Sequence, residues 1–262
     1  MEELPLYFDF LARKRVKLLR QFAVQFQAYC ETDRLLDSLE RVLVSGLDVN
    51  GKSQVSLLPM LCIMQRQCAN AIEDFFAALG YQGWMTFRPA VEAALIIGKW
   101  FDDRHNCEVW IERRDHKEEY LKAYRGKALR SSSLPNSPRL QSLLSKLNDE
   151  FLHVNFDYYR RHMKLEGGAA DNLTLTALWT DTPLVAEAHV TAFAYVSRLL
   201  VCSVGEMLKN KFQCLHEFAD SSRDVAESLS ERVSHLIAEA PEVKRIFTEL
   251  AAWPRDLLGA SP

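Results

Sequence analysis

Few residues in this chain can break a helix, and this constrains the fold more than any other feature of the sequence. Only ten Gly and nine Pro occur among the 262 residues. A sandwich or barrel of many short strands needs a turn roughly every ten residues. Apolar residues instead recur at intervals of three and four over long stretches, which is typical of amphipathic helices. We therefore predict an all-α protein folded as a multi-helix bundle.

Turn signals divide this helical pattern into segments. We expect helices over residues 4–30, 33–47, 53–79, 89–103, 106–126, 138–163, 183–212, 215–238 and 241–251. Gly80 is predicted to stop the third helix, and Pro89 to occupy the first position of the fourth. Residues 131–138 form the clearest loop. Residues 172–180 alternate apolar and polar side chains, which predicts one short strand or hairpin arm.

No internal repeat, heptad array or low-complexity tail divides the chain. With 48% hydrophobic residues, the sequence is long and apolar enough for a sizeable core. We therefore expect a single helical domain over residues 1–262. Its central part is predicted over roughly residues 55–210, with the helices within 4–47 and 215–251 packed on it.

Composition excludes several classes of protein. Lys and Arg number 32 against 35 Asp and Glu, a net charge of -3, so no global basic field attracts nucleic acid or anionic lipid. The first residues lack the basic start and apolar run of a secretory signal. The most apolar stretch, 183–204, is interrupted by polar and charged residues, so no uninterrupted apolar run reaches the ~18 residues that a spanning helix needs. The six Cys are scattered, which is typical of reduced thiols. We expect a cytoplasmic protein with no membrane partner.

Several strong chemical motifs are absent from the sequence. It has no Gly-rich phosphate loop, no dinucleotide fingerprint, no paired C-x-x-C and no G-x-S-x-G. The Cys and His spacings match no zinc site. We therefore predict neither a cofactor nor a metal ion. A carboxylate-bridged metal site using Glu92, Asp102 and His153 stays open as a weaker alternative.

The predicted helix 138–163 carries the most informative pattern. At 100° per residue, one narrow polar line lies between two apolar strips. This line contains Lys146, Asp149, His153, Asp157, Arg160 and Lys164. If the line faces an internal cleft, His153 has carboxylates one turn to either side and is suited to acid–base chemistry. If the line faces water, the same residues form ordinary ion pairs on a solvated surface.

Two further groups of residues bear on function. Arg88 and Glu92 lie one helical turn apart, and such a pair is usually structural. Residues 121–148 contain six cations and no Asp or Glu, namely Lys122, Arg125, Lys127, Arg130, Arg139 and Lys146. Such a stretch is suited to contacting phosphates without regard to nucleotide sequence. The alternative is a mobile, solvated loop whose charge is incidental.

Two short motifs resemble a known group of proteins. The segment FRPAVEAAL at 87–95, followed by LNDEFLH at 147–153, is similar to an uncharacterised group of bacterial all-α proteins. That group is related to HEPN domains (higher eukaryotes and prokaryotes nucleotide-binding), the helical bundles of toxin and abortive-infection ribonucleases. The resemblance covers roughly residues 55–210. It implies that His153 matches the HEPN histidine and Asn148 the polar position before it.

The resemblance also implies an activity, with one departure from the pattern. Active HEPN ribonucleases carry an Arg shortly before the His, and here the nearest cation is Lys146. The implied function is engagement of RNA or nucleotide phosphates, including metal-independent RNA cleavage in bacterial defence or stress response, by a homodimer. His153 would act as acid or base, with Asn148 beside it and with Lys146 and Arg160 stabilising phosphate charge.

The remaining candidate residues fall into two groups around this site. Supporting positions are assigned to Arg88, Glu92, Asp149 and Asp157. Phosphate-binding positions are assigned to Lys122, Arg125, Lys127, Arg130 and Arg139. The alternative function is a non-enzymatic interaction or regulatory module whose charged helices bind a partner protein. The missing Arg, the acidic balance and the charged segment 106–126 favour that alternative, so the sequence leaves open whether the protein is an enzyme.

Overall fold

The computed structural model describes residues 3–46, 52–149, 163–167, 173–177 and 180–209. Apart from one hairpin these residues form helices, which confirms the predicted all-α bundle. The helices are α1 (Glu3–Gln21), α2 (Ala23–Gly46), α3 (Lys52–Phe76), α4 (Gly80–Asp102), α5 (Arg104–Ile111), α6 (Lys117–Tyr124), the 3-10 helix η1 (Gly126–Leu129), α7 (Ser137–Leu147) and α9 (Pro183–Lys209). The hairpin strands are β1 (Met163–Gly167) and β2 (Leu173–Ala177).

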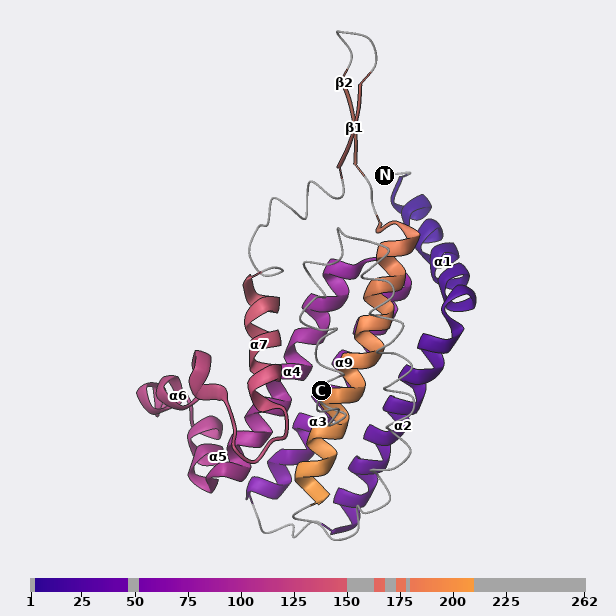
Figure 1. Cartoon of the computed structure of the whole chain (residues 1–262). Helices are drawn as coiled ribbons and strands as arrows, with labels where there is room; N and C mark the ends of the chain where they lie inside the picture. The colour runs from indigo at the N-terminus through magenta and orange to yellow at the C-terminus, as the bar shows by residue number, and fades with distance from the viewer. Residues whose placement is uncertain (1–2, 47–51, 150–162, 168–172, 178–179, 210–262) are drawn as a thin grey trace, which may run out of the picture.

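The core lies where α3, α4 and α9 meet. The pair α3–α4 has the most extensive contact, α9 packs on α2, α3 and α4, and α7 packs on α4. Figure 1 shows these helices side by side, with α5 and α6 projecting from one flank. The ring of Phe193 lies 4.8 Å from that of Phe75 and 5.2 Å from that of Phe87, centroid to centroid. All three side chains are buried, so aromatic packing across the three helices stabilises the bundle.

The end of α3 differs from the prediction. The helix stops at Phe76, and Ala78 takes the left-handed conformation at φ 58°. The backbone N–H of Ala78 donates to the Phe75 carbonyl and that of Leu79 to the Asp74 carbonyl, both at 3.0 Å. This is the Schellman pattern, which satisfies the last carbonyls of a helix. Ala78 occupies the position that Gly usually takes, so the prediction that Gly80 stops this helix is wrong.

Gly80 begins α4 instead of ending α3. A Cβ atom at this position would lie 2.3 Å from Cδ2 of His189, so the residue has no side chain because α9 approaches its backbone closely. Pro89 consequently lies inside α4 and not at its start. The lost backbone hydrogen bond is outweighed by the burial of the apolar face around Trp84 and Phe87.

Two other predicted boundaries are wrong. The N-terminal helices divide at Phe22 and not near residue 31. The polar residues there do not interrupt α2, because the Thr32 hydroxyl donates back to the Ala28 carbonyl at 3.0 Å within the helix. The charged segment 106–126 is split by a turn, in which the Asp115 N–H donates to the Glu112 carbonyl at 2.8 Å. This turn folds α6 back toward α5.

The predicted helix 138–163 is shorter than expected. Its first part is α7, and residues 150–162 lie outside the described residues. Met163 already belongs to β1, which pairs antiparallel with β2 from Met163 opposite Ala177 to Gly167 opposite Leu173. The helix therefore ends before Met163, and Lys164 does not belong to its polar line. The strand predicted over 172–180 is confirmed as β2.

The helix α9 qualifies by length and composition as a membrane span, contrary to the prediction that no stretch does. Its most apolar window has a mean hydropathy of 1.3, and 83% of that window is buried within the protein. Length and composition alone are weak evidence for a span, because core helices pass the same test. Buried polar side chains such as Thr191 and Ser197 also line α9. The predicted helices beyond residue 209 lie outside the described residues.

Candidate functional site

The helices α4 and α7 bring three of the predicted site residues together. The guanidinium Nε of Arg88 donates to Oδ1 of Asn148 at 2.5 Å, and Nη1 pairs with Oε2 of Glu92 at 2.9 Å. Arg88 and Glu92 are partly buried, with side chains 25% and 35% exposed. Hydrogen bonds to a charged group in such surroundings are stronger than neutral ones. The guanidinium is therefore fixed between an amide and a carboxylate.

This contact places an Arg beside the polar residue that precedes His153 in the sequence. The only cation at sequence positions close to Asn148 is Lys146, which is half-buried near the end of α7. Asp149 is exposed. His153, Asp157 and Arg160 lie outside the described residues. The structure thus joins Arg88, Glu92 and Asn148, which sequence reasoning had divided between supporting and catalytic roles.

Four of the predicted phosphate-binding residues lie close together along the chain, in the segment that runs from the last turn of α6 to the residue after η1. We call Lys122, Arg125, Lys127 and Arg130 the cation row, and all four are exposed. Among the described residues, none of the first three forms an ion pair with a carboxylate. The segment packs on the bundle through η1, which contacts α4 and α7. Arg130 Nε also donates to Oε1 of Gln141 in α7 at 3.1 Å.

Arg139, the fifth predicted phosphate-binding residue, is less exposed than the cation row. Its charge influences the pKa of Tyr195 in α9. Burial raises the pKa of the Tyr195 hydroxyl, and the positive charge of Arg139 opposes that rise. This electrostatic coupling associates Arg139 with the α7–α9 side of the bundle. The cation row is therefore the part of the predicted phosphate site that is most open to a ligand.

The loop after the cation row is anchored by a single carboxylate. Asp102 accepts hydrogen bonds from the Ser131 hydroxyl at 3.0 Å, from the Ser132 hydroxyl at 2.9 Å and backbone at 3.2 Å, and from the Ser133 backbone at 2.8 Å. Burial acts to raise the pKa of Asp102, but these hydrogen bonds outweigh it and hold the pKa below its ordinary value. These hydrogen bonds attach residues 131–133, which follow the cation row, to the end of α4.

The same contacts bear on the metal site that the sequence left open. Glu92 and Asp102 are ten positions apart on α4, which separates them by about 15 Å along the helix axis. Each is engaged by a different partner, so the two cannot bind one ion. Within the described part of the chain, no group of three His, Cys, Asp or Glu side chains is arranged to hold a metal ion.

Sequence reasoning missed a buried polar cluster at the start of α4. The carboxylate of Asp181 accepts from the Gly80 N–H at 2.8 Å, so it caps a helix from a distant part of the chain. The Trp84 indole N–H donates to Nδ1 of His189 at 2.9 Å, which leaves the ring proton of neutral His189 on Nε2. Both His189 and Asp181 are buried. The only sequence signal was a polar His inside an apolar stretch.

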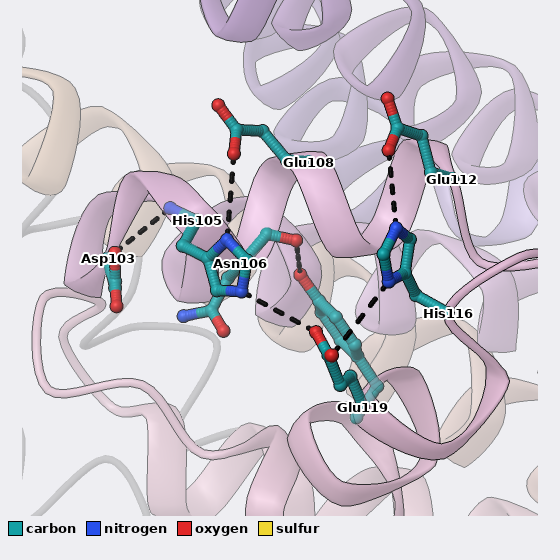
Figure 2. A network of polar contacts seen from close by, with 8 residues as sticks. Asp103, His105, Asn106, Glu108, Glu112, His116 and Glu119 are labelled. Atoms are coloured by element: carbon teal, nitrogen blue, oxygen red, sulfur yellow. Dashed lines mark hydrogen bonds and ion pairs between the residues drawn. The ribbon is translucent and has the colours of Figure 1, made fainter.

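A second histidine network lies on the projecting helices α5 and α6 (Figure 2). His105 lies 3.5 Å from the carboxylate of Glu108 and 3.6 Å from that of Glu119. His116 lies 3.5 Å from the carboxylate of Glu112 and 3.8 Å from that of Glu119. Glu119 is thus shared between two histidines and links α5 to α6. All five side chains are about half exposed, so each ion pair contributes little to stability.

Comparison with protein-family models, with curated proteins and with solved structures finds no match for this chain. The resemblance to HEPN-like proteins therefore stays a prediction. The geometry offers a fixed guanidinium at the α4–α7 contact and, more than 30 positions later in the chain, an exposed row of cations on an anchored segment. Both features are suited to anionic ligands.

Proposed function

We propose that this helical protein engages RNA or nucleotide phosphates through the cation row. The observation that carries the proposal is the exposure of these cations without carboxylate partners among the described residues, on a segment that Asp102 and Gln141 attach to the bundle. Because the backbone of this segment is already attached to the bundle, it loses little conformational freedom when phosphates bind. Contacts of this kind are independent of base sequence.

The proposal extends to metal-independent RNA cleavage by a HEPN-like, homodimeric cytoplasmic protein acting in bacterial defence or stress response. His153 would take the proton from a ribose 2′-hydroxyl or return one to the leaving oxygen. Arg88 would stabilise the developing phosphate charge, in place of the Arg that the sequence lacks before His153. Lys146 and Arg160 would also stabilise the phosphate charge, Lys146 through a compact ammonium group and Arg160 through a planar guanidinium. No cofactor is needed for this chemistry.

Binding is tested with fluorescently labelled single-stranded RNA at several salt concentrations. The variant Lys122→Gln, Arg125→Gln, Lys127→Gln loses three exposed cations. We expect weaker binding at every sequence tested, and a slope of log K against log salt that is smaller by about 2. The matched control is Arg13→Gln, Lys17→Gln, Arg20→Gln, which removes three exposed cations from α1. Equal losses in both variants would contradict a localised site.

Cleavage is tested separately with bulk cellular RNA and chelator in every reaction. We expect the wild type to cleave RNA, and His153→Ala and Arg88→Gln to lose that activity. Glu92→Gln is the matched control, because it disturbs the Arg88 ion pair but keeps the guanidinium. We expect Arg88→Lys to restore only part of the activity, because an ammonium lacks the planar fork of Arg. Undiminished cleavage by His153→Ala would overturn the assignment.

A second candidate function is a protein-interaction or regulatory module. The specific observation that favours it is the projecting unit α5–α6, whose exposed side chains are mostly charged. Acidic and basic residues are mixed there, which is unsuited to nucleic acid but suited to a charged protein surface. Absence of RNA binding by the wild type at low salt would leave this candidate ahead of the first.

A further inference from the structure

The helix α1 exposes an unusual amount of apolar surface. Leu6 is 64% exposed, Phe8 60% and Val16 51%, and Phe10 is also exposed. Elsewhere in the described residues, exposed large apolar side chains are scattered over several helices. Clustered apolar exposure of this kind marks a contact surface more often than isolated residues do.

Cations follow two residues of this apolar cluster, Leu6 and Phe10, along the same side of α1. Leu6, Phe10, Arg13, Lys17 and Arg20 follow one another at intervals of three or four and form an outward stripe, and all five are exposed. The opposite side of the helix carries the buried Leu11 and Leu18. Arg15 turns inward, where its Nε donates to the Glu73 carbonyl of α3 at 3.3 Å.

The charges of α1 complement an anionic surface. Its sequence holds five cations against two carboxylates, whereas the whole chain has a net charge of -3. One of those carboxylates, Asp9, lies close to the outward stripe, and the cations outnumber it there. A second copy of this chain meeting α1 through a two-fold axis would bring like charges together. An acidic ligand is therefore favoured over self-association.

The arrangement of the apolar side chains favours a lipid phase over a protein groove. Leu6 and Phe8 are two positions apart, which places them about 200° apart around the helix. A protein partner covers one face of a helix, whereas the boundary of a bilayer accepts apolar side chains on several sides of a helix end. Arg13, Lys17 and Arg20 follow at the level where lipid phosphates would lie.

We infer that α1 docks on an anionic lipid surface, with Leu6, Phe8 and Phe10 entering the boundary of the acyl chains and the three outward cations contacting phosphate groups. This contact is peripheral and needs no spanning helix. It departs from the sequence-based expectation of no membrane partner, because that expectation rested on the net charge of the whole chain and not on the charge of α1. It is also independent of the proposed function, because it uses a different helix from the cation row.

The test is co-sedimentation of the full chain with vesicles of phosphatidylcholine alone or with one third phosphatidylserine. We expect binding only to the anionic vesicles, weakened by salt. Arg13→Gln, Lys17→Gln, Arg20→Gln should lower the partition coefficient roughly 100-fold, since each cation near such a surface contributes about 1 kcal/mol. Leu6→Ser, Phe8→Ser should lower it at least tenfold. Both variants change exposed residues, and circular dichroism checks that they fold.

The reciprocal control is the cation-row variant Lys122→Gln, Arg125→Gln, Lys127→Gln, which should bind vesicles like the wild type. Three results would overturn the inference. The first is no binding to anionic vesicles at low salt. The second is an equal loss in the cation-row variant, which would show unspecific charge attraction. The third is a dimer in light scattering that Leu6→Ser, Phe8→Ser dissociates, which would assign the apolar surface to a second copy.

Discussion

Among the residues that the structure describes, histidine occurs in two opposite settings. His189 is buried at the α4–α9 contact, where it accepts a hydrogen bond from the Trp84 indole close to the Asp181 carboxylate. His105 and His116 lie on the projecting helices, each between two carboxylates at 3.5 to 3.8 Å. The exposed network has more carboxylate partners, and the buried one has tighter packing.

The two settings differ in how much a polar contact contributes to the free energy of unfolding. A buried donor or acceptor that loses its partner cannot turn to water, so its loss costs the full desolvation penalty. The two charges of an exposed ion pair interact well with water when they are apart, so pairing them adds little free energy. Salt screens the attraction further. We therefore expect single changes at the buried histidine to be costly and changes at the exposed ones to be small.

The largest effect is expected for Gly80→Ala. The added Cβ would lie 2.3 Å from the His189 ring and 2.7 Å from the Asp181 carboxylate, so α4 and α9 must move apart. We expect a loss of roughly 3 kcal/mol in the free energy of unfolding, measured by urea denaturation. Gly126→Ala is a useful contrast, because no atom lies within 4 Å of its added Cβ, so its cost comes only from the left-handed backbone at φ 58°. A Gly80→Ala variant as stable as the wild type would contradict the close approach.

A smaller loss is expected for Trp84→Phe. Phe keeps one aromatic ring at this position but removes the five-membered ring with its N–H, so Nδ1 of His189 loses this donor. We expect destabilisation of about 2 kcal/mol, part of it from the smaller ring. Urea denaturation measures the change. If the double variant Trp84→Phe, His189→Leu regains stability, the unsatisfied nitrogen is identified as the cause.

Asp102 is an intermediate case, because it is half-buried and accepts several hydrogen bonds. We expect Asp102→Asn to cost about 1 to 2 kcal/mol at pH 7. The pKa of Asp102 is lower in the folded protein than its ordinary value, so its contribution is present above about pH 4 and disappears as the pH falls through the folded pKa. Denaturation of both proteins from pH 7 to pH 2 should show the difference shrinking. A constant difference would contradict a role for the charge.

The smallest effect is expected for Glu119→Gln, which removes the carboxylate shared by His105 and His116. Its side chain is 56% exposed, so we expect a change of about 0.5 kcal/mol or less at pH 6 and none at high salt. Thermal denaturation at two salt concentrations measures it. A loss as large as that of Trp84→Phe would remove the contrast between the two histidine settings.

Long periodic segments were the part of the fold that could be predicted from sequence. The helix beginning at Pro183 and the strand within 172–180 follow directly from apolar spacing. The α3–α4 turn could not be predicted, because Ala78 takes a conformation that sequence rules assign to Gly. The start of α4 depends on Asp181, a capping residue far along the chain, so the local sequence around Gly80 could not predict it.

The candidate site shows the same division. The pair Arg88–Glu92 follows from helical spacing, and the acid-free stretch was visible in composition. The contact of Arg88 with Asn148 joins two helices and depends on how they pack, so no sequence interval could reveal it. The anchoring of the serine loop by Asp102 is likewise a tertiary contact. Contacts between side chains on different helices or loops are what single-sequence reasoning misses.

The continuity of α4 connects three separate regions of the molecule. This one helix is roughly 35 Å long and begins at the Asp181 cap, carries Arg88 in its middle and ends at Asp102. A continuous helix transmits displacement along its axis as a stiff rod does. Crowding at Gly80 would therefore shift the guanidinium and the loop anchor together, so a change in the core would alter affinity for anions without touching the ligand.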